Sequence, residues 1–94
     1  MAGYFILHTK WHTLDKLREY QAGARTSLQA AGAESIVYDA KTEVVEGESR
    51  FPATVIIKFE SLEAAKAWYN SPDYQAILGL RLTSSEGVAR FADS

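Results

Sequence analysis

The sequence predicts an α+β domain whose elements follow the order β-α-β-β-α-β, with one extra helix before the last strand. Three observations predict it. Residues 4–11 are rich in β-forming side chains that alternate between two faces, as in a strand. Apolar residues between positions 14 and 31 recur at steps of three and four, as on one side of a helix. An apolar run over 53–59 leads directly into a second helix, which a serine at position 61 opens.

The N-terminal strand has one apolar face and one mixed face. Its odd-numbered residues, Phe5 to Trp11, point one way, and its even-numbered residues, Tyr4 to Lys10, point the other. Thr13 is the expected N-cap of the following helix, and Gly32 is its expected stop. Gly23 lies inside this helix, where glycine costs about 1 kcal/mol against alanine unless another element packs closely against it.

The middle of the chain predicts two further strands. The first covers residues 34–39, is interrupted over 40–42 and resumes over 43–46, so a bend or bulge is expected at the interruption. A turn over 47–50 precedes the strand 53–59, whose residues Val55, Ile57 and Phe59 share one face.

Two helices and a short strand are expected after residue 59. The first helix carries the stripe Leu62, Ala65, Trp68 and Tyr69, and Pro72 ends it. The second is expected to place Tyr74, Ile77, Leu78, Arg81 and Leu82 on one face and to stop at Gly87. A last strand is then expected over 88–92.

This order is the ferredoxin-like arrangement, an antiparallel sheet with helices on one face. No helix remains to cover the other face, which carries the following residues: Tyr4, Ile6, His8, Thr54, Ile56 and Lys58. A partly apolar surface of that extent commonly meets a partner. A homodimer that packs sheet against sheet, a dimeric α+β barrel, is therefore expected.

The composition narrows the function classes. The 94 residues predict one domain over 1–94, and their net charge of −2, with mixed signs along the chain, predicts no nucleic-acid partner. The chain has no cysteine, and no apolar run nears the ~20 residues that span a bilayer, so we expect a cytoplasmic protein without a membrane partner. No metal-ligand spacing appears, and neither a metal nor another cofactor is expected.

The segment Ala67-Trp68-Tyr69-Asn70-Ser71-Pro72-Asp73-Tyr74-Gln75 resembles the domain of unknown function 1330 family. Further segments fit the same pattern: Val45-Glu46-Gly47, residues 59–65 and Leu80-Arg81. The resemblance covers almost the whole chain and implies a dimeric α+β barrel, but no activity. Glu60 replaces the usual proline, and residues 48–51 replace a segment that often carries tryptophan. A site built on His8 or His12 would be particular to this protein.

Five residues are candidates for a ligand site. Arg81 shares a helix face with apolar residues, so it either pairs with a buried carboxylate, with Glu46 and Asp73 as candidates, or binds an anionic ligand. Tyr20, Tyr69 and Tyr74 either pack in the core with satisfied hydroxyls or line a pocket. His8 either acts as a general base or ligand, or is a solvated or hydrogen-bonded interface residue.

Two functional hypotheses from different classes remain open. In the first, the barrel binds a small, partly apolar or anionic molecule among His8, Tyr20, Tyr69, Tyr74 and Arg81, and acts as a cofactor-independent isomerase or monooxygenase. In the second, the dimer is a binding or structural module without chemistry. A closed pocket with a polar end favours the first hypothesis, and a fully packed interior favours the second.

Overall fold

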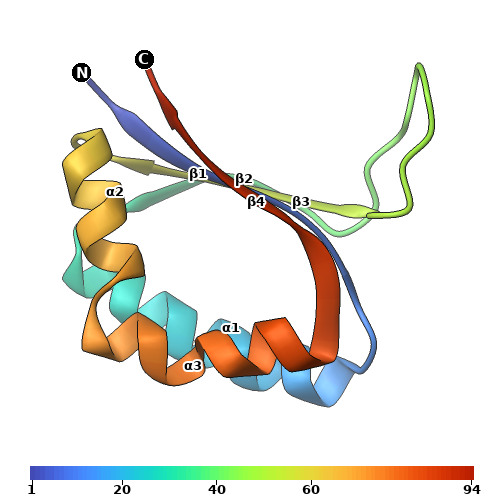
Figure 1. The fold of residues 1–94 in the computed structure, drawn as a ribbon, viewed down its shortest axis with the longest axis horizontal. Helices are drawn as coiled ribbons and strands as arrows, with labels where there is room; N and C mark the ends of the chain where they lie inside the picture. The colour runs from blue at the N-terminus through green and yellow to red at the C-terminus, as the bar shows by residue number, and fades with distance from the viewer.

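A computed structural model describes residues 1–94. Its elements follow in the order β1 (Gly3–Trp11), α1 (Leu14–Ala30), β2 (Glu34–Asp39), β3 (Ala53–Phe59), α2 (Leu62–Tyr69), α3 (Pro72–Ser84) and β4 (Ser85–Asp93). The four strands form one antiparallel sheet in the order β2-β3-β1-β4, and the three helices lie on one side of it (Figure 1). The ferredoxin-like arrangement with an extra helix is thereby confirmed. No helix is both long and apolar enough to span a membrane.

A polar side chain caps the first turn of each helix. Thr13, Ser61 and Ser71 are the N-caps of α1, α2 and α3, and each side-chain oxygen accepts a hydrogen bond from the backbone N–H three residues on. Gly32 follows α1 with a φ of +67°, a conformation that glycine adopts without steric cost. These local signals place the helix boundaries close to the expected ones.

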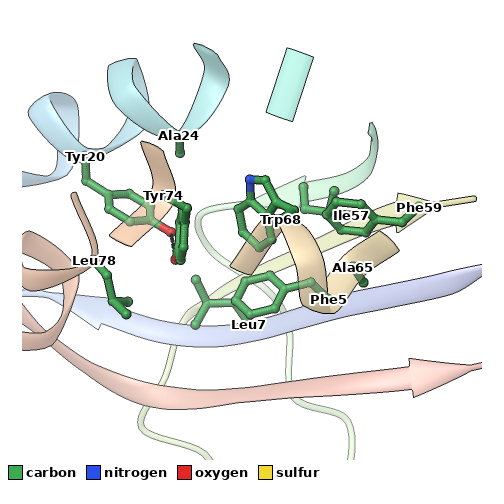
Figure 2. Close-up of a cluster of buried hydrophobic side chains, with 10 residues drawn as sticks. All are labelled: Phe5, Leu7, Tyr20, Ala24, Ile57, Phe59, Ala65, Trp68, Tyr74 and Leu78. Carbon is green, nitrogen blue, oxygen red and sulfur yellow. Dashed lines mark hydrogen bonds between the residues drawn. The ribbon is translucent and has the colours of Figure 1, made fainter. Parts of the chain in front are cut away.

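The strand register assigns each strand residue to one of two faces. Phe5 pairs with Ile57 on one side and with Phe91 on the other, so all three point toward the helices. The core lies between this face and the helices, and comprises Phe5, Leu7, Tyr20, Ala24, Ile57, Phe59, Ala65, Trp68, Tyr74 and Leu78 (Figure 2). The opposite side, here called the open face, is formed by Tyr4, Ile6, His8, Lys10, Glu34, Val37, Asp39, Thr54, Ile56, Lys58, Glu86, Val88, Arg90 and Ala92.

Helices α1 and α3 pack closely at Gly23. A Cβ at this position would lie 2.7 Å from Ile77 Cγ2, which is shorter than any comfortable carbon–carbon contact. Gly23 is therefore the case in which another element packs closely against a glycine inside a helix. The contact brings the two helices together beside the buried residues Tyr20 and Tyr74.

The segment between β2 and β3 differs from its expected structure. Residues 43–46 do not resume a strand, because no neighbouring strand offers them backbone partners, and residues 40–52 form a loop. The register irregularity lies between Ser35 and Val37 rather than at 40–42. Thr42 instead closes the loop by donating from both its backbone N–H and its hydroxyl to the carbonyl of Pro52.

The C-terminal elements also differ from expectation. Helix α3 ends at Ser84, before Gly87, and β4 is longer than the expected 88–92 because β1 supplies partners along its whole length, from Gly3 to Trp11. Leu82, expected on the buried face with Arg81, is 63% exposed. The buried residues of α3 are Tyr74, Leu78 and Arg81, spaced four and three apart.

Candidate functional site

A cluster of polar groups lies inside the core, between α1, α3 and the sheet. The hydroxyl oxygens of Tyr20 and Tyr74 are 2.6 Å apart, and Arg81 Nε donates to Tyr74 Oη over 3.3 Å. Tyr74 is fully buried, and Tyr20 and Arg81 are only 8% and 6% exposed. Figure 2 shows the two tyrosines approaching each other from different helices. Tyr20, Tyr74 and Arg81 are called the Tyr–Arg cluster below.

The helical repeat and the close helix packing together build this cluster. Tyr74 and Arg81 are seven residues apart, about two turns, so they lie on the same side of α3. Tyr20 comes from the neighbouring helix, 54 positions earlier in the sequence. Trp11, the last residue of β1, stacks against Tyr20 with 5.2 Å between ring centroids. Sequence reasoning missed Trp11, although its odd position in β1 points it toward the helices.

Arg81 is a buried cation without an acidic partner in the chain. Neither Glu46 nor Asp73 pairs with it, and its side-chain hydrogen bond goes to a tyrosine hydroxyl instead. Burial alone would lower the pKa of Arg81, but the nearby oxygens of Tyr74 and Tyr20 outweigh this and raise it. Buried guanidinium groups are normally paired with carboxylates, so the positive charge here lacks its usual compensation.

The two tyrosines supply neutral donors rather than negative charge. Burial raises the pKa of Tyr20, proximity and hydrogen bonding to Tyr74 raise it further, and the opposing effect of Arg81 is smaller. Tyr20 is therefore a neutral phenol at physiological pH. The hydrogen bond between the two tyrosine hydroxyls uses one of their two protons as a donor, which leaves the other free to donate. The guanidinium of Arg81 adds five N–H donors. The cluster thus holds more donors than acceptors, which suits an anionic oxygen.

The remaining candidate residues occupy different places. Tyr69 is half-buried and adjoins the cluster, with its ring centroid 5.4 Å from that of Tyr74. His8 lies on the open face, where its Nδ1 is 3.0 Å from Thr54 Oγ1. The sheet therefore separates His8 from the tyrosines and Arg81. The sequence already indicated this separation, because His8 has an even position in β1, whereas the core residues Phe5 and Leu7 have odd positions.

Two hollows in the surface lie away from the Tyr–Arg cluster. One is lined by Glu48, Ser49, Arg50 and Phe51, and a second, adjoining one by Lys10, Thr42, Val44, Ser49, Arg50, Phe51 and Pro52. Both are shallow and belong to the loop between β2 and β3. No three histidine or acidic side chains gather closely enough to hold a metal ion. The side chains of the Tyr–Arg cluster are themselves buried, with Tyr74 0%, Arg81 6% and Tyr20 8% exposed.

Comparison with known proteins gives a family and a fold. The model of the family described as Domain of unknown function (DUF1330) matches residues 2–93. No curated protein matches the chain. A dimeric ferredoxin-like protein of unknown function from Jannaschia sp. CCS1 is 14% identical, with a TM-score of 0.82 and 100% of both chains covered.

Two enzymes also share the fold. SnoaB, a cofactor-independent oxygenase from Streptomyces nogalater, is 10% identical, with a TM-score of 0.67, and the match covers 99% of this chain and 92% of SnoaB. The hydroxynitrile lyase of Passiflora edulis is 12% identical, with a TM-score of 0.73 and coverages of 99% and 93%. Such low identities show a common fold alone, and the two named reactions differ from each other.

Proposed function

The chain belongs to the DUF1330 family, and we propose that it is a homodimer that binds a small, partly apolar anion beside Arg81. The observation that carries the proposal is the buried guanidinium of Arg81, which no carboxylate of the chain neutralises. A ligand carboxylate, phenolate or enolate would supply the missing negative charge. Its oxygens would accept hydrogen bonds from the donors of the Tyr–Arg cluster that have no acceptor within the cluster. The rings of Trp11, Tyr20 and Tyr69 would contact its apolar part.

The homodimer is supported by the surface of a single chain. Its accessible surface is 6100 Å², whereas a folded monomer of 10.4 kDa usually exposes about 5400 Å². The excess fits an uncovered sheet face. The Jannaschia protein is described as dimeric, which agrees with this arrangement. Packing two open faces together would make a dimeric α+β barrel with the helices outside. A cytoplasmic location is part of the same proposal and is testable by cell fractionation.

Cofactor-independent enzyme chemistry is a further step of this hypothesis. Neutral tyrosine hydroxyls and a fixed guanidinium are suited to stabilising an oxyanion that develops on a bound substrate. That chemistry would serve an isomerase or a monooxygenase. An isomerisation leaves the mass of the bound molecule unchanged and a monooxygenation does not, so mass spectrometry of the ligand after incubation in air would distinguish the two.

A non-catalytic binding or structural module is the second candidate, and the close packing of the cluster favours it. Tyr74 is fully buried, its hydroxyl is satisfied by Tyr20 and Arg81, and no buried side-chain polar atom lacks a hydrogen-bond partner. In this alternative, Arg81 serves to hold α1 and α3 in register against the sheet.

Native mass spectrometry of freshly purified protein, repeated after denaturation, is the first test. A dimer that releases a small anionic molecule supports the proposal and names the ligand class. A dimer that holds nothing favours the structural module. A monomer rejects the homodimer.

Thermal unfolding with a panel of aromatic carboxylates and their methyl esters tests the role of Arg81. A carboxylate at 100 times its Kd should stabilise the wild type by about 2.7 kcal/mol, and its neutral ester should not. Arg81→Met should abolish the effect, whereas Arg25→Met, at an exposed arginine of α1, should retain it. Equal responses to acids and esters in the wild-type protein would reject an anion site even if Arg81→Met fails to fold.

A further inference from the structure

The loop between β2 and β3 projects from the sheet on the side of the open face. Figure 1 shows it rising away from the side that carries the helices. Its neighbours agree with this view, because Lys10 of the open face lines a hollow together with Thr42, Val44 and Arg50. Residues 43–48 of this loop, Glu-Val-Val-Glu-Gly-Glu, are called the acidic arm below.

The base of the acidic arm is fixed to the domain. Thr42 and Pro52 are joined by two hydrogen bonds of 2.8 and 2.9 Å. Arg50 Nη1 lies 3.0 Å from a carboxylate oxygen of Glu86, a residue of the open face. Gly47 has a φ of +78°, which only glycine adopts without strain, and turns the chain back. The arm is therefore held in a defined direction, standing off the sheet of its own chain.

The acidic arm exposes both apolar and acidic side chains. Val45 is 85% exposed and Val44 is 49% exposed, whereas Val55 of the neighbouring strand β3 is partly buried against the core. The carboxylates of Glu43, Glu46 and Glu48 form no ion pair within the chain. An exposed valine pair between unpaired glutamates is typical of a segment that contacts another surface.

The open face carries the complementary pattern. Lys10, Lys58 and Arg90 are exposed there, and none of them forms an ion pair within the chain. Apolar residues accompany these cations: Ile6, Ile56 and Val88 on the same three strands, and Val37 on the edge strand β2. The acidic residues of the same face are at its β2 edge or already engaged, since Glu34 and Asp39 belong to β2 and Glu86 binds Arg50. An acidic segment would therefore be attracted toward β1 and β4.

We propose that the acidic arm of each chain binds the open face of a second copy, so that two arms clasp the homodimer reciprocally. The arm's glutamates would pair with Lys10, Lys58 and Arg90 of the partner subunit, and its valines would cover apolar surface at the rim of the interface. Two-fold symmetry makes the contact occur twice. This inference rests on the homodimer proposed above. It adds that the acidic arm forms part of the interface and that its charges favour a second copy of the chain as the partner.

Charge reversal in the full-length chain tests the arm. Glu43→Lys, Glu46→Lys and Glu48→Lys together should weaken the dimer Kd, measured by sedimentation equilibrium, at least tenfold. Lys10→Glu, Lys58→Glu and Arg90→Glu together should do the same, and combining both sets should restore the dimer. Glu46→Lys alone is compared with Glu19→Lys, an exposed glutamate on α1. The first should raise Kd several-fold and the second less than twofold.

The outcomes separate this inference from the proposed function. Restoration by the combined reversal supports the arm, as does a wild-type Kd that rises between 0.1 and 1 M salt, where charge pairs are screened. A wild-type dimer whose Kd stays within twofold in the arm variant rejects the arm contact and leaves the homodimer standing. A monomeric wild type rejects both. Because the arm is exposed and outside the core, its variants should retain the wild-type circular dichroism.

Discussion

The two faces of one sheet have opposite characters in this protein, and β1 belongs to both. Phe5 and Leu7 are 2% and 3% exposed beneath the helices, while Ile6 and His8, between and beside them, remain half-exposed on the open face. The helix side holds a ten-residue core, and the open side carries unpaired cations among aliphatic residues. The helix side therefore determines whether one chain folds, whereas the open side is the surface through which we propose that chains associate.

The division of roles between the two sides of the sheet is tested most strongly by removing one large side chain from each side. Trp68 packs against Phe5, Phe59 and Tyr74 and donates to Ser27 Oγ over 3.0 Å. Trp68→Ala should lower the free energy of unfolding by about 3–5 kcal/mol, much of the stability of a small domain. Ile6→Ala should cost a dilute monomer roughly 1 kcal/mol and chiefly weaken dimerisation. Urea unfolding at low protein concentration measures both, and equal losses would contradict the division of roles.

The packing of α1 against α3 gives the next largest effect. Gly23→Ala would add a methyl group 2.7 Å from Ile77 Cγ2, and this overpacking should destabilise by about 1–3 kcal/mol. In an unpacked helix, the same change would stabilise by about 1 kcal/mol. Placing Gly23→Ala in an Ile77→Ala background removes the clashing atom, so the substitution should then become stabilising. A thermal-unfolding cycle of the four variants checks the reversal of sign.

Removing one side-chain hydrogen bond on each side of the sheet tests the same division of roles. Ser27→Ala leaves the buried indole N–H of Trp68 without its acceptor, which should cost about 1–3 kcal/mol. Thr54→Val removes the partner of His8 on the open face, where water can replace it, and should cost the dilute monomer no more than about 0.5 kcal/mol. Urea unfolding measures the loss of unfolding free energy in both variants. A larger loss for Thr54→Val than for Ser27→Ala would contradict the assignment of the stabilising core to the helix side.

Tyr20 is expected to have a modest effect at neutral pH and a larger one in alkali. Tyr20→Phe removes one hydrogen bond and should cost about 1 kcal/mol at pH 7. Because burial raises the pKa of Tyr20, the unfolded chain loses this proton near pH 10 while the folded chain retains it. Wild-type stability should therefore fall above pH 10, by up to about 1.4 kcal/mol per pH unit from this group.

Tyr20→Phe removes that contribution and should show a shallower decline between pH 9 and 11. Tyr4→Phe, on the open face, is the matched control and should keep the wild-type decline. Unfolding by urea at each pH provides the measurement. A Tyr20→Phe profile parallel to the wild type would show that the hydroxyl is ionised equally in both states.

Much of the architecture was predictable because its signals are local. Alternation along β1 separates Phe5 from His8, and Ser61 and Gly32 mark helix ends through their own backbone and side-chain geometry. The expected strand at 43–46 was wrong because strand formation depends on a non-local partner. Its valines have strand propensity, but a strand requires a neighbour that pairs with its backbone, and β3 pairs with β2 only as far as Asp39.

The alternation of the strands, the apolar stripes and N-caps of the helices, and the presence of a sheet face without a helix all follow from the amino-acid order alone. Three contacts became visible only in the folded chain: Tyr20 meets Tyr74 across 54 positions, Ile77 fills the space beside Gly23, and Arg81 binds a tyrosine hydroxyl instead of Glu46 or Asp73. Periodicity specifies which side of an element is buried. The partner of a buried group depends on how two elements pack, and no single element encodes that geometry.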